Sequence, residues 1–152
     1  GPNAECCIKT TLARQIANWV IIYSPLQMAA DLIENYKGHP AFRFFRDFDA
    51  DCDWSKALQG EIGDYIVVAR RAKDRYFLGA GTDEKARTLV QKLDFLEPGV
   101  TYTATIYADA PDAGRNPEAY LIGKRAVTAR DTIRIEMAER GGQAITFIPA
   151  EK

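Results

Sequence analysis

Histidine is nearly absent from this sequence: among 152 residues there is one, His39. Hydrolases of the triad type need a histidine as general base, and most zinc sites need histidine or clustered cysteine ligands. The scarcity therefore excludes most chemistry of these classes. His39 stands directly before Pro40, in a position typical of the start of a helix, so we expect it to have a structural role.

Cysteine is also scarce. Cys6 and Cys7 are adjacent and Cys52 stands alone, so the sequence has neither a CxxC motif nor an even-numbered disulfide framework. We expect Cys52 to be a free, buried thiol without a redox or metal-binding role. The cysteines indicate no particular cellular compartment.

The sequence has little excess charge and no long apolar run. Lysine and arginine number 20 and aspartate and glutamate 21, for a net charge of -1, and no basic stripe occurs, so nucleic acid is not expected as a partner. The longest apolar run, residues 19–23, is far shorter than the roughly 20 residues that a bilayer-spanning helix needs. No membrane segment is expected. The start Gly1-Pro2, without methionine or a signal peptide, indicates a fragment of a longer protein.

Residues 1–48 have the periodicity of helices. Apolar side chains recur every three or four positions over residues 12–23, which predicts a first helix. Ser24, followed by a proline, has the pattern of the N-cap of a second helix, which Gly38 ends. A third, short helix is expected after Pro40. The first helix is apolar on nearly every face at residues 19–23, so we expect part of it to pack against a second copy or, by preference, a preceding domain.

From Gly63 onward apolar and polar residues alternate, which is the periodicity of strands. The fold class is predicted as mainly β: an antiparallel β-sandwich of about seven to eight strands, preceded by two or three short N-terminal helices. Residues 1–48 would be the helical segment and residues 49–152 the sandwich domain. Gly141-Gly142 predicts a hairpin between the last two strands. The expected strands are residues 65–69, 76–78, 89–95, 102–108, 120–128, 132–137 and 143–148.

Two motifs lie within the predicted strands. Arg70 and Arg71 are interpreted as charged residues on a strand edge that prevent pairing with another sheet. Gly79 and Gly81 lack the following helix that a phosphate-binding loop requires, so we expect them to form a bulge or bend.

Acidic residues give no catalytic or metal site in this sequence. The alternating Asp47, Asp49, Asp51 and Asp53 suggest calcium, but an EF-hand loop needs a glycine and a glutamate where other residues stand, so we expect a solvated loop whose carboxylates cap backbone amides. A glycosidase needs two carboxylates held about 5–10 Å apart. The candidate pairs lie in turns, where acidic residues are common, and we expect no catalytic role for them. These pairs are Glu61 with Asp64 and Asp83 with Glu84.

Exposed aromatic side chains are the usual platforms on which sugar rings stack. Trp54, Tyr107 and Tyr120 are the candidates for such contacts. Aromatic residues in a sandwich more often belong to the core or to an interface. These three are therefore kept as weak ligand-binding candidates.

The residue string from Ser24 to Leu32, Ser-Pro-Leu-Gln-Met-Ala-Ala-Asp-Leu, resembles the junction between barrel and tail in glycoside hydrolase family 97. Further matching strings are Gly-Glu-Ile-Gly-Asp-Tyr at residues 60–65 and Tyr-Thr-Ala-Thr-Ile-Tyr at residues 102–107. Members of that family are α-glucosidases and α-galactosidases with an N-terminal β-sandwich, a (β/α)8 catalytic barrel and a C-terminal β-sandwich. The resemblance implies that residues 8–36 are the last barrel helix and its exit, and that the C-terminal domain begins near residue 55.

The family's catalytic carboxylates and its calcium-binding glutamates lie on the barrel, upstream of the matched strings. The resemblance therefore implies no catalytic residue, metal or cofactor in this chain, and it implies the catalytic barrel of the same parent chain as the partner. Self-association through the first helix is expected where that barrel is missing. Family habit suggests a periplasmic or secreted protein. A non-catalytic C-terminal structural domain is thus the leading hypothesis, with a carbohydrate-binding module, a stand-alone interaction domain and a small independent enzyme as alternatives.

Overall fold

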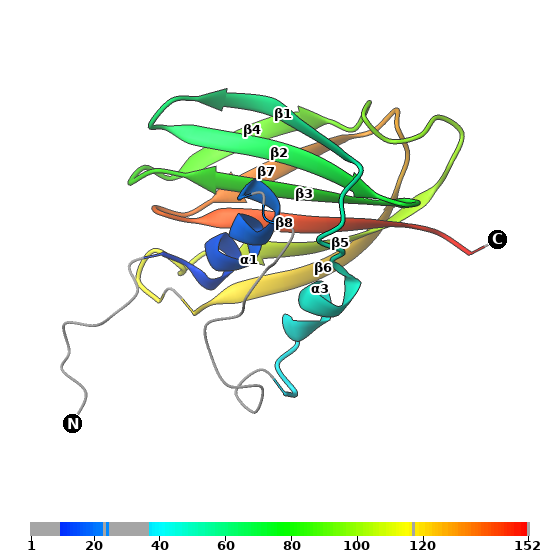
Figure 1. The fold of residues 1–152 in the computed structure, drawn as a ribbon. Helices are drawn as coiled ribbons and strands as arrows, with labels where there is room; N and C mark the ends of the chain where they lie inside the picture. Colours follow the sequence, from blue (N-terminus) through cyan, green and yellow to red (C-terminus); the bar gives the residue numbers. More distant parts are fainter. Residues whose placement is uncertain (1–9, 23, 25–36, 117, 152) are drawn as a thin grey trace.

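The computed structural model describes residues 10–22, 24, 37–116 and 118–151 (Figure 1). The second helix predicted from the sequence lies outside these residues. The described part holds two helices and eight strands. Their bounds are α1 Leu12–Ile21, α3 Phe42–Asp47, β1 Trp54–Glu61, β2 Tyr65–Ala72, β3 Arg75–Thr82, β4 Arg87–Lys92, β5 Tyr102–Asp109, β6 Tyr120–Val127, β7 Thr132–Met137 and β8 Gly142–Pro149. No helix among the described residues is long and apolar enough to cross a bilayer.

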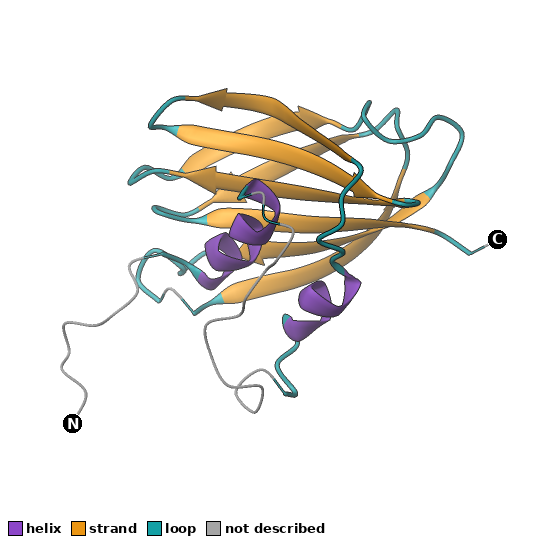
Figure 2. Ribbon diagram, in the orientation of Figure 1, coloured by secondary structure: helices purple, strands orange, loops and turns teal. Residues whose placement is uncertain are grey.

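The strands form two antiparallel sheets stacked face to face. Six strands lie in the order β1-β2-β3-β8-β5-β6, and β4 pairs with β7 in a second sheet. Helices α1 and α3 lie on one face of the large sheet, and the small sheet lies behind its other face (Figure 2). The prediction of an antiparallel β-sandwich preceded by short helices is confirmed.

The main core fills the space between the two sheets. In β7 the side chains alternate between exposed and buried, so Ile133, Ile135 and Met137 point into the sandwich. They meet Leu78, Ile145 and other apolar side chains of the large sheet. Each such side chain stabilises the fold by about 1.5–3 kcal/mol relative to an exposed position. Alternation of apolar and polar residues in the sequence therefore specifies which face of each strand is buried.

A second core lies between the large sheet and the helices. Ala13, Ile16, Ala17 and Val20 form the buried stripe of α1, which contacts β2, β3, β5 and β8. The stripe has the spacing of one helix face. This core joins residues 12–21 to the sandwich as one folded unit.

Trp19 lies at the side of α1 and packs against rings contributed by α3 and the residue after it. Its ring centroid lies 4.6 Å from that of Phe45 and 6.1 Å from that of Phe48. Helix α3 thus supplies part of the cover that the sequence prediction had assigned to another domain or a second copy. Ile22, directly after α1, is 60% exposed.

Gly79 and Gly81 lie in a regular part of β3, so the expected bulge or bend is wrong. The pairing of β2 with β3 runs without a register shift from Tyr65 opposite Thr82 to Ala72 opposite Arg75. A Cβ atom at position 79 would lie 2.7 Å from the carbonyl oxygen of Ala17, and one at position 81 would overlap the Arg14 guanidinium. The glycines are required because α1 crosses β3 in direct contact with its backbone.

The expected role of Arg70 on a sheet edge is also wrong. Strand β2 lies between β1 and β3, and Arg70 is only 5% exposed. Its Nε donates to the carbonyl oxygen of Val20, and its Nη2 donates to that of Ile21 at 3.4 Å. Arg70 therefore binds carbonyl groups at the C-terminal end of α1, which have no partner within the helix.

The last two strands do not form the predicted hairpin. Strand β7 pairs with β4, whereas β8 pairs with β3 and β5, so Gly141 carries the chain from one sheet to the other. The Asp109 carboxylate fixes this crossing, because Oδ2 accepts from the amides of Ala138 at 2.9 Å and Gly142 at 3.0 Å. A Cβ at position 141 would overlap the same oxygen. Both strands alternate apolar and polar residues, and that pattern fits either partner.

Strand β1 was not predicted from the sequence. Only Trp54, Leu58 and Gln59 are even partly buried along it, so its apolar alternation is weak. Its register with β2 shifts between Ala57 and Gln59, where a bulge interrupts the pairing. The strand is nevertheless held to β2 by pairing from Trp54 to Glu61.

Candidate functional site

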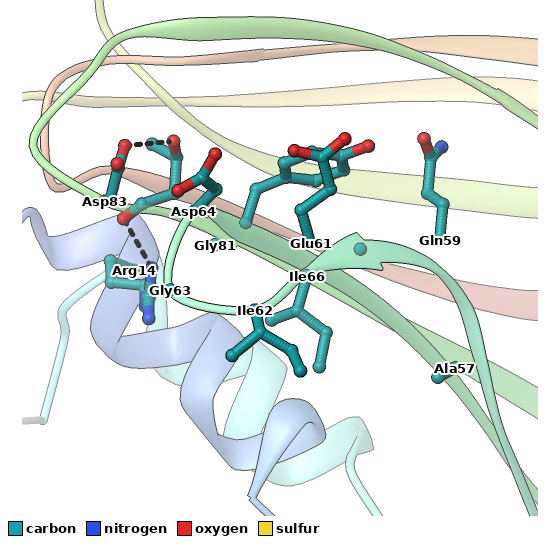
Figure 3. Close-up of a pocket in the computed structure, with 13 residues that line it drawn as sticks. Arg14, Ala57, Gln59, Glu61, Ile62, Gly63, Asp64, Ile66, Gly81 and Asp83 are labelled. Carbon is teal, nitrogen blue, oxygen red and sulfur yellow. Dashed lines mark hydrogen bonds between the residues drawn. The ribbon is translucent and has the colours of Figure 1, made fainter.

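An open pocket of about 600 Å³ lies between the first turn of α1 and the turn that joins β1 to β2 (Figure 3). Gly63, with φ of +83°, makes this turn, and Ile62 at its tip is fully exposed. Arg14 reaches into the same region, where Nη1 donates to the carbonyl oxygen of Thr82 at 2.8 Å and Nε donates to Asn18 Oδ1 at 3.0 Å. The pocket therefore lies where α1 meets the large sheet.

Two of the carboxylates at this pocket, Asp64 and Asp83, pair with one arginine. Arg87 Nη2 lies 3.5 Å from Asp64 and 3.4 Å from Asp83, and its guanidinium stands 5.3 Å from the ring centroid of Tyr65. A backbone hydrogen bond from Lys85 holds the pKa of Asp83 below its usual value, with a smaller contribution from Arg87. A glycosidase general acid needs the opposite shift. Asp83 is thus unsuited to that role.

The other members of the carboxylate pairs do not change this conclusion. Glu84 lies 3.4 Å from Arg140 on the exposed surface. In Figure 3 the carboxylates of Glu61, Asp64 and Asp83 lie on one side of the turn, and Ile62 lies on the other. Glu61 and Glu84 are exposed, so neither carboxylate is enclosed in the way that a glycosidase general acid is.

The alternating aspartates form separate contacts. Asp47 pairs with Arg43 at 3.4 Å, Asp53 with Arg71 at 3.0 Å, and Asp49 accepts from the amide of Asp51 at 3.0 Å. Within the described ranges, no three His, Cys, Asp or Glu residues are placed to hold a metal ion. These contacts agree with the interpretation of a solvated loop with capping carboxylates.

The two scarce residue types both have local contacts next to α3. His39 Nδ1 accepts from the amide of Ala41 at 3.3 Å, directly before the helix, a contact that agrees with the structural role expected for it. Cys52 is free and half-buried, and its Sγ donates to the carbonyl oxygen of Asp49 at 3.2 Å. Burial raises the pKa of the Cys52 thiol, so the reactive thiolate is disfavoured.

The three aromatic candidates lie in different places. Tyr107 is fully buried, and its ring packs edge-on against Phe44 at 5.5 Å, so it presents no face to a sugar. Trp54 is half-buried against Tyr76 at 6.2 Å. Tyr120 is half-buried too, and its ring lies 5.3 Å from that of His39. The structure does not bring these residues together into one platform.

Asp109 is a partly buried carboxylate whose contacts the sequence prediction missed. Burial raises its pKa, against the lowering effects of Thr11, the two backbone amides and Arg14. Its position at the end of β5 joins α1, β5 and the crossing between the sheets. A lone aspartate at a strand end gives no signal of this in the sequence, because its partners come from distant segments.

Comparison with known proteins identifies the domain. Residues 51–148 match the family model described as the C-terminal, oligomerisation domain of glycosyl-hydrolase 97. The chain belongs to this family. In a glycoside hydrolase family 97 enzyme from Pseudoalteromonas sp. strain K8, the similar region is 46% identical with a TM-score of 0.89, and it covers 94% of this chain and 23% of that one. The retaining α-galactosidase of Bacteroides thetaiotaomicron is 32% identical over 136 residues, which are 89% of this chain and 20% of that protein.

The glycoside hydrolase family 97 domain described here thus spans about a fifth of the length of these relatives. A β-arabinopyranosidase with 24% identity and a TM-score of 0.72 shares the fold. The matched range of residues 51–148 contains β1 to β7 and β8 as far as Ile148, and neither α1 nor α3. The family's oligomerisation description therefore concerns the sandwich.

Among the described residues, a few large apolar side chains of this family 97 domain are exposed on the strands and their turns. Val90 of β4 is 67% exposed, Leu121 of β6 54% and Ile122 of β6 39%. Single exposed apolar residues are common on protein surfaces. Strand β6 is the place where two such residues adjoin.

Proposed function

We propose that this domain is the non-catalytic C-terminal part of an α-glycoside hydrolase, and that it supports the catalytic barrel and joins copies of the enzyme. The observation that carries the proposal is the family match over the sandwich, with 46% identity to the family 97 enzyme from Pseudoalteromonas. Structures of that enzyme in complex with acarbose and with panose support α-linked oligosaccharides as the substrate class. The α-galactosidase relative supports α-galactosides as the second class.

The site supports an accessory role in two ways. Asp64 and Asp83 at the pocket are paired with Arg87, and Asp83 has a lowered pKa, so Asp83 is not prepared for acid catalysis. Helix α1 is tied to the sheet by Arg70 and Arg14, so the helix and the sandwich move as one body. By family resemblance α1 would continue from the barrel, and this rigid junction would then transmit the position of the barrel to the sandwich.

The test uses the full-length protein that contains this domain. It is expected to hydrolyse an aryl α-glucoside or an aryl α-galactoside, with one of the two preferred by its ratio of kcat to KM. Sedimentation equilibrium of the isolated domain is expected to give the mass of a dimer. A full-length protein inactive on both substrates would contradict the enzyme assignment, and a strictly monomeric domain would contradict the joining role.

A carbohydrate-binding role is the second candidate, and it is favoured by the half-exposed ring of Tyr120 beside His39. Aromatic faces of this kind stack on sugar rings. Titration with maltose and with melibiose, followed by NMR shifts, tests this role. A saturable shift that disappears in Tyr120→Ala, and persists in Tyr107→Phe, is its expected result; no saturable change at millimolar sugar would remove it.

A further inference from the structure

Strand β6 forms an open edge of the large sheet. It is the last strand in the order, and it pairs with β5 alone. The pairing continues from Tyr120 opposite Asp109 to Val127 opposite Tyr102 without a register shift. An edge strand leaves alternate N–H and C=O groups without a partner in the sheet, which makes it a template for another strand.

The middle of β6 is uncovered on both faces. All residues from 121 to 126 are exposed. Because successive side chains in a strand point to opposite faces, Leu121 and Ile122 lie on different sides of the sheet. Neither α3 on one side nor the small sheet on the other covers them. Each face of the sheet therefore presents one exposed apolar side chain at this edge.

The other edge of the large sheet is protected. Strand β1 has a bulge between Ala57 and Gln59, which interrupts a regular edge. The Gln59 side chain donates to the Val90 carbonyl oxygen at 3.2 Å and to Gln91 Oε1 at 2.8 Å, and so ties β1 to β4. No comparable bulge occurs in β6, whose ladder is continuous.

The remaining surfaces of the sandwich are also occupied or polar. Helix α1 contacts β2, β3, β5 and β8 on one face of the large sheet. The outer face of the small sheet is mostly polar, with Arg134 paired to Glu136 at 2.9 Å and Val90 as an exposed apolar side chain opposite Arg134. The family's oligomerisation description covers residues 51–148, which exclude both helices. Strand β6 is thus a regular, exposed edge within the range that this description covers, where Leu121 and Ile122 lie beside the cations Lys124 and Arg125.

We propose that two copies of this chain join through β6, edge to edge and antiparallel, so that their large sheets form one continuous sheet. This inference rests on the proposed joining function and names its surface. A two-fold axis through Gly123 places Leu121 opposite Arg125 of the second copy and Ile122 opposite Lys124. The aliphatic stems of these cations cover the apolar side chains, and no two cations stand directly opposite each other.

In the two-fold arrangement the β6 edge of each copy is paired with the β6 edge of the other, so the assembly stops at a dimer. An isologous contact of this kind closes, because each copy offers the same strand. Backbone hydrogen bonds then provide affinity, and the apolar pair excludes water from them. The partner of β6 is therefore a second β6.

The test is sedimentation velocity of the chain over a wide range of concentration, with three variants. The double variant Leu121→Lys/Ile122→Lys is expected to raise the dimer dissociation constant by about 100-fold or more, because each of two changed strands contributes about tenfold. Val90→Lys is the matched control, since Val90 is 67% exposed on a strand of the other sheet, and it should leave the constant unchanged. Ile22→Lys tests the first helix, where Ile22 is 60% exposed.

The outcomes separate the two proposals. A dimer lost only in the β6 variant supports the inference. A dimer that persists in that variant, or is lost in Ile22→Lys instead, overturns it and leaves the joining function standing. A monomeric wild-type chain overturns both. Hydrogen exchange of the wild-type chain is an independent test. The amides of residues 121–126 should exchange more slowly as the concentration rises and the dimer forms. Exchange rates at these amides that do not change when the dimer forms would also overturn the inference.

Discussion

The guanidinium of Arg70, in the middle of β2, donates a hydrogen bond from Nε to the carbonyl oxygen of Val20 near the end of α1. It also donates from Nη1 to Ser55 Oγ at 3.1 Å. One buried cation thus joins the helix, the second strand and the edge strand β1. This contact makes the attachment of α1 to the sandwich testable.

Arg70→Met should weaken that attachment. The substitution keeps much of the buried stem but leaves carbonyl groups of α1 unpaired, so we expect the free energy of unfolding to fall by about 1–3 kcal/mol. Urea denaturation measures it. Arg71→Met is the matched control, because the adjacent Arg71 makes an exposed pair with Asp53, and it should change stability little. Equal losses in both variants would contradict the special role of Arg70.

Gly79→Ala should separate α1 from β3. The added Cβ would lie 2.7 Å from the Ala17 carbonyl oxygen and 2.8 Å from Val20 Cβ, so the helix must move. We expect a loss of about 1–3 kcal/mol in unfolding free energy. Gly123→Ala, where the added atom meets nothing within 4 Å, should leave stability unchanged or slightly raised. If Gly79→Ala proves neutral, the close crossing is not essential.

Asp109 should give the fold a pH dependence of known sign. Burial raises its folded pKa above the ordinary value of 3.8, so the folded state binds the proton more tightly than the unfolded state. The stability from this group is full below the unfolded pKa and is lost as the pH rises through the folded pKa.

The Asp109→Asn variant isolates this effect, because the amide oxygen can still accept from Ala138 and Gly142. The unfolding free energy of the wild type minus that of the variant should fall as the pH rises from about 4 toward 7. Urea titrations of both proteins at several pH values give this difference. A difference that rises with pH would mean that the hydrogen bonds outweigh burial.

Tyr107→Phe should cost nothing, although Tyr107 is fully buried. Its hydroxyl has no hydrogen-bond partner among the described residues, and burial raises its pKa to about 12. Removing an unpaired buried hydroxyl should leave the unfolding free energy unchanged or raise it by up to about 1 kcal/mol. Tyr102→Phe is the control, since the Tyr102 hydroxyl bonds to the backbone of Glu97, and it should lose about 1 kcal/mol. Calorimetry or urea denaturation of the two variants distinguishes these cases.

The strands could be predicted because alternation is a local pattern. Thr132–Met137 shows it clearly, and the structure buries the apolar members of that strand. The pairing of the strands could not be predicted in the same way. Strands β7 and β8 follow each other directly, yet Asp109 and the glycine at position 141 send them into different sheets. Alternation specifies which face of a strand is buried, but it does not specify which strand pairs with it.

The contacts of the site escaped prediction because they join distant segments. Arg70 and Val20 stand 50 residues apart, and Arg14 and Thr82 stand 68 apart. From neighbouring residues alone, Arg70 and Arg71 predict a sheet edge, and Gly79 and Gly81 predict a bulge. Both are explained instead by the helix that crosses them. The family resemblance, by contrast, depends on residue strings, and it led directly to the correct domain.

We expect this sandwich domain to have no catalytic activity of its own. The most direct measurement is hydrolysis of an aryl α-glucoside and an aryl α-galactoside by the purified 152-residue chain. We predict a rate equal to that of buffer, unchanged in Asp83→Asn and in Glu61→Gln. Saturable hydrolysis by the chain, abolished by either substitution, would contradict the account.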